Sequence, residues 1–131
     1  MIIDTSAIIA ILAGEPDAAY FAQMIEENPA PRIGAPSLLE ASMVLTRWFG
    51  DTAEAALDAF VRESGAEIVA FDLPQLRAAQ NAYLRYGKGR HPAGLNYGDC
   101  MSYALAQVCD EKLLFKGEDF SHTDIKQVGA V

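Results

Sequence analysis

The sequence lacks several features that would indicate whole classes of protein. Its longest apolar run, AIIAILA, is far shorter than the roughly 20 residues that span a bilayer. Met1 is followed at once by an expected strand and not by a signal peptide, so we expect a cytoplasmic protein without membrane contact. Repeats, low-complexity tracts and linkers are also missing, and residues 1–131 are expected to form a single domain.

Cysteine is scarce as well. The two cysteines, Cys100 and Cys109, lie nine residues apart on one expected helix. At about 3.6 residues per turn their side chains point to opposite faces and cannot pair with each other. Since no zinc-ligand spacing accompanies them, we expect buried, reduced thiols.

Basic residues are outnumbered by acidic ones. The chain has 10 Lys and Arg residues against 18 Asp and Glu residues, and its formal net charge is −8. Proteins that bind nucleic acid by neutralising many phosphates are usually basic. Any nucleic-acid role must therefore depend on a local site whose acids are masked by cations.

What the sequence does have is an alternation of short apolar segments with longer amphipathic ones, separated by Gly and Pro. The expected strands are residues 1–4, 32–35, 67–72 and 112–117, with an edge strand in 124–131. The expected helices are residues 5–14, 15–28, 38–49, 52–64 and 73–87, and one that Asp99 opens. This order predicts a helix-rich α/β domain whose parallel sheet is covered by helices on both faces.

Four acids stand where such a sheet would bring them together. Asp4 ends the first expected strand, and Glu40 lies four residues beyond the segment RIGAP. Asp99 begins the helix before the last clear strand, and Asp119 follows that strand. Because ligands of parallel α/β sheets bind beyond the carboxyl ends of the strands, we expect the four carboxylates to gather along one edge.

Each acid also has a purely structural interpretation. Asp4 can cap the helix that follows it, and Ser37–Glu40 spells the capping-box pattern S-x-x-E. Asp99 can be an N-cap or a first-turn acid, which the helix dipole favours by about 0.3–1 kcal/mol. Asp119 can be an ordinary turn residue. Taken one at a time, the structural and functional interpretations are about equally good.

Taken together, the acids favour a metal site. Asp4 and Asp99 lie in apolar segments with no Lys or Arg beside them, and a buried carboxylate is costly unless it is paired or binds a cation. Several carboxylates in one place repel each other unless a divalent ion neutralises them. Oxygen-only donors suit Mg²⁺ or Mn²⁺ better than zinc.

Four segments carry a resemblance to a known family. MIIDTSAIIAIL at the start, Glu40 after PSLL, LNYGDCMSYALA, and LLFKGEDFSHTDI resemble the signature blocks of PIN-domain ribonucleases, most closely the VapC toxins of bacterial toxin–antitoxin pairs. The blocks occur in family order and extend from residue 1 to about residue 125. The resemblance implies a PIN-like three-layer α/β/α sandwich with a short, mostly parallel sheet of four to five strands.

The resemblance also implies roles for the acids. Asp4, Glu40, Asp99 and Asp119 match the family's acidic quartet and would be both catalytic and metal-binding. Asp4 and Asp99 would be the most direct Mg²⁺ ligands, with Mn²⁺ as a substitute. Glu40 would act through water, and Asp119 would complete a second cation position.

Three neighbouring residues extend this implied site. Thr5 or Ser6 matches the hydroxyl that accompanies the family's first Asp, where it would orient a water or a phosphate. Glu118 stands where many relatives have Asn or Asp, so either Glu118 or Asp119 could face the metal.

The implied function is that of a Mg²⁺-dependent endoribonuclease toxin. Such a protein would hydrolyse RNA phosphodiesters with metal-activated water. Its RNA would be of the tRNA or rRNA class, a VapB-like antitoxin would silence it, and it would form a homodimer.

Two other classes of function stay open. A signalling receiver domain would use Asp72 as phosphoacceptor and Lys116 as its lysine. Receivers, however, carry paired acids after the first strand, where this chain has Asp4 followed by a Thr, and Asp72 can simply cap a helix. A catalytically inactive PIN-fold binding module is the other alternative, which the complete quartet argues against.

Candidate RNA contacts are few. His91 and His122 are expected in loops with surface or turn roles. Trp48 is expected to pack in the core, and a solvated loop position is an equally good interpretation for Lys88. The set that could hold phosphates or stack on bases is Arg47, Trp48, Lys88, Arg90, His91, Tyr97 and Lys116.

Overall fold

A parallel sheet lies at the centre of the fold. The computed structural model describes residues 1–129. Its four-stranded sheet has the order β3-β2-β1-β4, and every neighbouring pair is parallel. The strands are β1 (Ile2–Ile3), β2 (Arg32–Gly34), β3 (Glu67–Val69) and β4 (Leu113–Leu114). The predicted helix-rich α/β class is confirmed.

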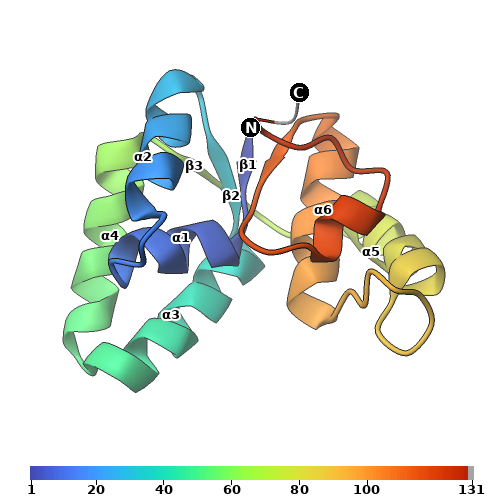
Figure 1. Ribbon diagram of the computed structural model, residues 1–131, viewed down its shortest axis with the longest axis horizontal. Helices are drawn as coiled ribbons and strands as arrows, with labels where there is room; N and C mark the ends of the chain where they lie inside the picture. Colours follow the sequence, from blue (N-terminus) through green and yellow to red (C-terminus); the bar gives the residue numbers. More distant parts are fainter. Residues whose placement is uncertain (130–131) are drawn as a thin grey trace.

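Helices cover both faces of this sheet. Figure 1 shows α1 to α4 on one side of the strands and α5 and α6 on the other. Their bounds are α1 (Thr5–Leu12), α2 (Ala18–Glu27), α3 (Ala35–Phe49), α4 (Thr52–Ser64), α5 (Leu73–Tyr86) and α6 (Tyr97–Cys109), and a short 3₁₀ helix, η1, spans Asp119–His122. The arrangement is the α/β/α sandwich expected from the resemblance.

Two separate apolar cores result from the alternation of side chains along the strands. Successive residues of a strand point to opposite faces. Ile2 and Leu113 accordingly lie in the core under α5 and α6, whereas Ile3 and Leu114 lie in the core under α1 to α4. A strand of two buried residues therefore contributes one side chain to each of the two cores.

Two helix starts were predicted wrongly, each by three residues. The helix expected to begin at residue 15, with Pro16 in its first turn, begins only at Ala18, so Pro16 precedes α2. Pro36 and Ser37 were expected to lead into a helix but lie inside the first turn of α3, where a proline costs no hydrogen bond. The expected end of the helix 52–64 is confirmed, since Gly65 follows α4 in the left-handed conformation with φ 69°.

Two side-chain predictions also need correction. Trp48 was expected in the core but is 54% exposed near the end of α3, because Ala41 and Leu45 supply the buried face of that helix. Both cysteines are free, as predicted, but only Cys100 is buried, and Cys109 is half-buried.

The expected strand in residues 124–131 is reduced to one contact in the described part of the chain. Gln127 forms a single parallel bridge with Leu113, flanked by backbone hydrogen bonds from Leu113 N to Lys126 O and from Val128 N to Leu113 O. Residues 130 and 131 of that prediction lie outside the described residues. No helix within residues 1–129 has the length and apolar character needed to cross a membrane.

Candidate functional site

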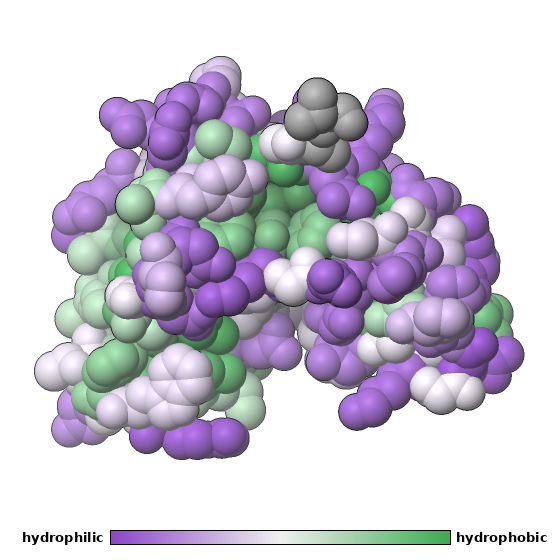
Figure 2. Space-filling view, in the orientation of Figure 1, coloured by the Kyte–Doolittle hydropathy of each residue, from purple (hydrophilic) through white to green (hydrophobic). Residues whose placement is uncertain are grey.

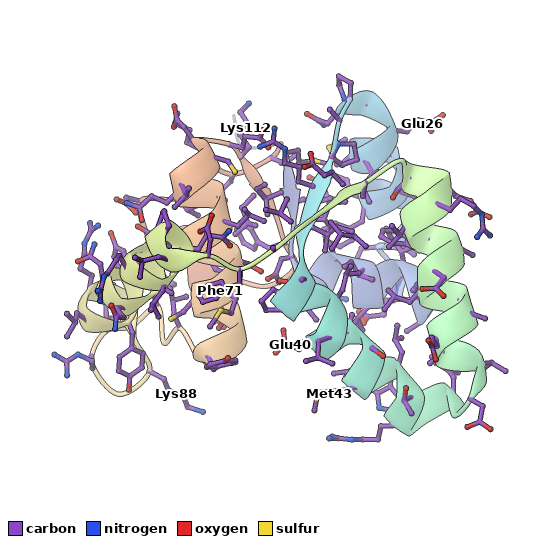
Figure 3. All side chains as sticks on the ribbon, turned by 180° about the vertical axis from the view of Figure 1, so that it is seen from behind. Glu26, Glu40, Met43, Phe71, Lys88 and Lys112 are labelled. Carbon is purple, nitrogen blue, oxygen red and sulfur yellow. The ribbon has the colours of Figure 1, made fainter. Side chains whose placement is uncertain are left out.

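The candidate site lies at the carboxyl edge of the sheet. Asp4 directly follows β1, and α3, which carries Glu40, directly follows β2. Asp119 begins η1 after β4, and Asp99 lies in the first turn of α6. Figure 3 shows Glu40 on the side of α3 that faces α6. The four acids thus come from four different elements that meet at one edge.

Asp4 is held by hydroxyl groups. Its Oδ2 accepts hydrogen bonds from Ser6 N at 3.0 Å and Ser6 Oγ at 2.5 Å, so Asp4 does cap α1. Its Oδ1 accepts a hydrogen bond of 2.5 Å from Ser102 Oγ. Asp4 is only 4% exposed and has no ion pair with any residue in 1–129. Neutral donors alone orient this buried carboxylate.

Behind Asp4 lies a second layer of buried hydroxyls. Ser102 Oγ lies 3.1 Å from Ser37 Oγ, and Thr5 Oγ1 donates a hydrogen bond of 3.1 Å to the Ser37 carbonyl. Ser37 therefore does not act as the cap of a capping box, and the structural interpretation of Ser37–Glu40 is wrong: the N-cap of α3 is Gly34. Of the two candidate hydroxyls beside Asp4, Ser6 contacts its carboxylate and Thr5 does not.

Ser102 was missed by sequence reasoning. It lies three residues after Asp99, and residues at that spacing share one face of a helix. That spacing from a candidate ligand was the signal that could have found it.

Asp99 occupies the third position of α6 in a capping box with Asn96. The Asn96 side chain accepts a hydrogen bond from Asp99 N at 2.9 Å, and Asp99 Oδ2 accepts one from Asn96 N at 3.1 Å. Of the two structural alternatives, the first-turn acid is therefore correct and the N-cap is not. The capping box fixes one carboxylate oxygen and leaves Oδ1 without a hydrogen bond from residues 1–129.

The electrostatics connect all four acids. Burial raises the pKa of Asp99 from 3.8 to about 6, with further increases from the negative charges of Asp4, Asp119 and Glu40, while the Asn96 backbone hydrogen bond opposes them. Asp119, and not its neighbour Glu118, is among the charges that act most strongly on the pKa of Asp99. The carboxylates therefore share one electrostatic environment at the start of α6.

Glu40 reaches that environment across the gap between α3 and α6. A Cβ placed on Gly98 would lie 2.6 Å from Oε1 of Glu40, far inside van der Waals contact. The glycine therefore leaves room for the Glu40 carboxylate directly beside Asp99.

The four carboxylates converge without forming a closed cluster. Within residues 1–129, no three Asp, Glu, His or Cys side chains stand together at metal-binding separations. The donor chemistry nevertheless fits a hard divalent cation, because every candidate ligand is an oxygen. Mg²⁺ in particular takes one or two carboxylates and keeps several waters, so it needs no closed protein cage.

Lys116 stabilises the rim of the site without pointing into it. Its backbone N donates a hydrogen bond of 2.9 Å to Ser6 Oγ. Its Nζ pairs with Glu15 and, at 3.1 Å, with Asp17, and these hydrogen bonds raise the pKa of the ammonium group. The Lys116 ammonium group is therefore paired with acidic residues of the loop between α1 and α2.

The segment that carries Asp119 is fixed by a buried tyrosine. The Tyr103 hydroxyl donates a hydrogen bond of 2.5 Å to Asp124 Oδ1, and Arg85 approaches Oδ2 of the same residue at 3.3 Å. The hydrogen bond from Tyr103 lowers the pKa of Asp124. Phe120, the buried residue directly after Asp119, packs against Phe115, which precedes Asp119 in the chain. Both flanks of Asp119 are thus attached to the body of the fold.

Asp72 and His91 have structural roles. Asp72 caps α5 by accepting a hydrogen bond of 3.1 Å from Gln75 N, as its structural alternative predicted. His91 Nδ1 accepts a hydrogen bond from Ala93 N at 3.0 Å, and its ring packs edge-on against Tyr86. A receiver-type site built on Asp72 and Lys116 therefore has neither residue available.

Comparisons with known proteins agree with the sequence motifs. A family model described as PIN domain matches residues 1–126. Ribonuclease VapC30 of Mycobacterium tuberculosis is 47% identical over 128 residues, which cover 98% of this chain and 98% of that protein. Ribonuclease VapC of Mycolicibacterium smegmatis is 48% identical over 128 residues, covering 98% and 99%.

Solved structures share the fold at low sequence identity. M. tuberculosis VapC20, described as a toxin that cleaves the sarcin-ricin loop, superposes with a TM-score of 0.78 at 19% identity, over 97% of both chains. VapBC2 from Rickettsia felis, bound to a DNA fragment of its promoter, superposes with a TM-score of 0.75 at 15% identity, over 96% of this chain and 94% of that one.

Proposed function

This chain belongs to the PIN domain family and to its VapC branch, and from that premise we propose that it is the toxin of a toxin–antitoxin pair, a Mg²⁺-dependent endoribonuclease that acts in the cytoplasm. We take residues 1–131 to be one PIN-like domain. The observation that carries the proposal is the placement of four carboxylates at the carboxyl edge of the sheet, close enough for three of them to raise the pKa of Asp99 beyond the effect of burial. Relatives that are 47–48% identical over nearly the full chain are ribonucleases by name.

The cation would be held by Asp4 and Asp99, with Glu40 and Asp119 acting through water or at a second position. Mn²⁺ would substitute for Mg²⁺, since both are hard ions that accept oxygen ligands. When bound, a divalent cation stabilises negative charge on the phosphate and makes water a better nucleophile.

The chain's own residues would orient and assist. Ser6 and Ser102 fix the two oxygens of Asp4, and Asn96 fixes one oxygen of Asp99, which leaves the other oxygen available to a cation. Glu40 has no hydrogen bond within residues 1–129 and can accept a proton from water. Thr5 would act indirectly, by positioning Ser37 behind the Ser102 hydroxyl.

The partners follow from the same premise. A VapB-like antitoxin would silence the toxin, and an antitoxin arginine would complement the acidic pocket. The chain would form a homodimer through apolar side chains that are exposed on α3 and α5, namely Leu39, Trp48, Leu73, Leu76 and Leu84. Light scattering of the purified chain, alone and co-expressed with the neighbouring antitoxin, checks both partners: a monomer that binds no antitoxin would contradict them.

The main experiment compares wild type with Asp99→Asn on total cellular RNA, in Mg²⁺, in Mn²⁺ and in EDTA. We expect discrete fragments that require the metal and disappear in the variant, and the fragment ends would identify a tRNA or rRNA substrate. Asp58→Asn is the matched control, because it removes one exposed carboxylate from α4, away from the candidate site.

Other outcomes have distinct meanings. Fragments that persist in EDTA or in Asp99→Asn would identify a contaminant or another mechanism. Folded protein that binds Mg²⁺ but cleaves no cellular RNA would favour the catalytically inactive PIN-fold module.

A further inference from the structure

The positive charge of this acidic chain is concentrated in one segment. Residues 73–98 contain no Asp or Glu and hold four of the chain's 10 Lys and Arg residues, namely Arg77, Arg85, Lys88 and Arg90. All 18 acidic residues therefore lie elsewhere, together with only six basic ones. The segment comprises α5, the loop that follows it and the first residues of α6.

Three of these four cations have no ion pair within residues 1–129, and two of the three, Lys88 and Arg90, lie on the loop after α5. Arg85, by contrast, is occupied by Asp124. Arg90 makes only a long hydrogen bond of 3.4 Å from Nε to the Leu84 carbonyl.

The loop that presents Lys88 and Arg90 has a defined shape. Lys88 N donates to Leu95 O, and Leu95 N donates to Tyr86 O, both at 2.9 Å, which closes the loop at its base. His91 closes its tip through the hydrogen bond from Ala93 N. These hydrogen bonds fix the backbone from which the exposed Lys88 and Arg90 side chains extend, so the backbone loses little entropy on binding.

The loop also lies beside the candidate site. It leads directly into the first turn of α6, where Tyr97 is 78% exposed two residues before Asp99. Figure 3 shows Lys88 at the same end of the molecule as Glu40 and Met43, and Lys112 at the opposite end. Figure 2 shows the surface hollowed between two lobes at the lower edge of the view, below the carboxyl edge of the sheet.

We propose that residues 88–97 form the surface along which RNA approaches the carboxylates: Lys88 and Arg90 bind backbone phosphates, and the exposed Tyr97 stacks on a base of the same strand. This inference rests on the proposed ribonuclease function and specifies its substrate class. A base can stack on a side chain only where it is not stacked in a helix. The bound segment is therefore single-stranded.

The test measures RNA binding separately from cleavage. Fluorescence anisotropy follows a labelled, unstructured RNA of mixed sequence as it binds protein that carries Asp99→Asn, in Mg²⁺, so that the RNA stays intact. Lys88→Gln, Arg90→Gln and Tyr97→Ala are added singly to this protein. Lys112→Gln is the matched control, since Lys112 is an exposed lysine without an ion pair in residues 1–129 at the other end of the molecule.

We expect Lys88→Gln and Arg90→Gln each to weaken binding about fivefold at about 0.1 M salt, and to reduce the salt dependence by about 0.7 in log–log slope. Tyr97→Ala should weaken binding of the single strand about fivefold or more and have little effect on a duplex of the same sequence. Lys112→Gln should bind like the parent protein.

Three results would overturn the inference. One is equal loss of affinity in Lys112→Gln and Lys88→Gln, which would indicate non-specific attraction. Another is unchanged affinity in all three loop variants. The third is a Tyr97→Ala variant that changes the oligomeric state and not RNA affinity, since Tyr97 also lines an apolar groove with Tyr83 and Met101.

The experiment distinguishes failure of this RNA-binding surface from failure of the proposed ribonuclease function. Wild-type protein that cleaves RNA, with loop variants that bind like the control, would leave the function intact and reject this surface. If the loop variants lose RNA binding but the wild type never cleaves RNA, the surface would be supported and the proposed ribonuclease function rejected.

Discussion

Glu40 lies beside Asp99 only because residue 98 has no side chain. Any Cβ there would overlap the Glu40 carboxylate, which is the mobile end of a flexible side chain and can move away at little cost. The glycine therefore affects the position of Glu40 far more than it affects the fold.

Gly98→Ala separates these two effects. Inside a helix, Ala is favoured over Gly by up to about 1 kcal/mol, so the free energy of unfolding should stay equal or rise. RNA cleavage should fall about 100-fold, because small displacements of catalytic groups have effects of that order. Thermal unfolding and the cleavage rate are measured on the same preparation.

A double-mutant cycle provides the control for Gly98→Ala. If displacement of Glu40 is the cause, the alanine should have little further effect in protein that already carries Glu40→Ala. Full additivity of the two changes would contradict this explanation.

Single residues also show how much of the candidate site could be predicted from the sequence alone. The four acids could be selected because three of them follow short apolar strands and Asp99 opens the helix before the last strand. Ser102 is harder to select, since its spacing from Asp99 places it on the same face of α6 but does not show that Asp4 lies opposite, 98 positions earlier in the chain. Trp48 was misplaced because the apolar spacing of α3 continues past the point where the core ends.

At the scale of elements, the segment after β4 depends on α6 for its position. The buried Tyr103 hydroxyl has Asp124 as its partner, so this hydrogen bond attaches residues 115–124 to the helix that carries Asp99. Two candidate ligands, Asp99 and Asp119, are thereby tied to each other through one tyrosine.

Asp124→Ala should destabilise the protein by about 1–3 kcal/mol, because it leaves the buried tyrosine hydroxyl without an acceptor. Asp124→Asn keeps an acceptor oxygen and should recover much of this loss. The free energy of unfolding in urea measures both variants at neutral pH. Equal stability of Asp124→Ala and wild type would contradict the role given to this hydrogen bond.

The same contact has a pH dependence of known sign. The pKa of Asp124 is lower in the folded than in the unfolded chain, so its contribution is present above the ordinary value of 3.8 and disappears as the pH falls through the lowered pKa. The difference in stability between wild type and Asp124→Ala should therefore narrow in acid.

Element order and element type could be predicted from the sequence, whereas element boundaries could not. Alternating apolar runs and amphipathic stretches sufficed for all four strands and six helices within residues 1–129. The start of α3 was placed too late because Pro36 reads as a helix breaker, although a proline is tolerated in a first turn. Side chains in the site belong to distant segments, and their contacts depend on packing that no local pattern encodes.

For the whole molecule, the four carboxylates are an electrostatic cost to folding. The pKa of Asp99 is raised in the folded state, so the folded chain binds its proton more tightly than the unfolded chain does. The contribution of Asp99 to the free energy of unfolding therefore falls as the pH rises from about 4 to about 6, and its full cost persists above that range.

In EDTA we expect this loss to be about 1–2 kcal/mol. The full shift from 3.8 to about 6 would correspond to about 3 kcal/mol, which we reduce because the carboxylate partly reaches solvent. Asp99→Asn should remove the slope and be the more stable protein at pH 7. Urea unfolding across this pH range gives both quantities.

Mg²⁺ should offset the same cost. At pH 7 it should raise the melting temperature of wild type and raise that of Asp99→Asn much less, because binding to the folded state alone stabilises it. An equal rise in both proteins would place the cation elsewhere.

The two-residue strand β1 also limits which insertions and substitutions the protein can tolerate near its start. Ile2 and Ile3 face different cores, and Asp4 follows them without a spacer, held by a hydrogen bond from its N to Leu114 O. One residue inserted before Asp4 would exchange the two faces and displace the carboxylate in the same event. An insertion or deletion in this segment therefore disturbs both the core packing and the position of the Asp4 carboxylate. A substitution of one apolar residue by another can disturb the core packing alone.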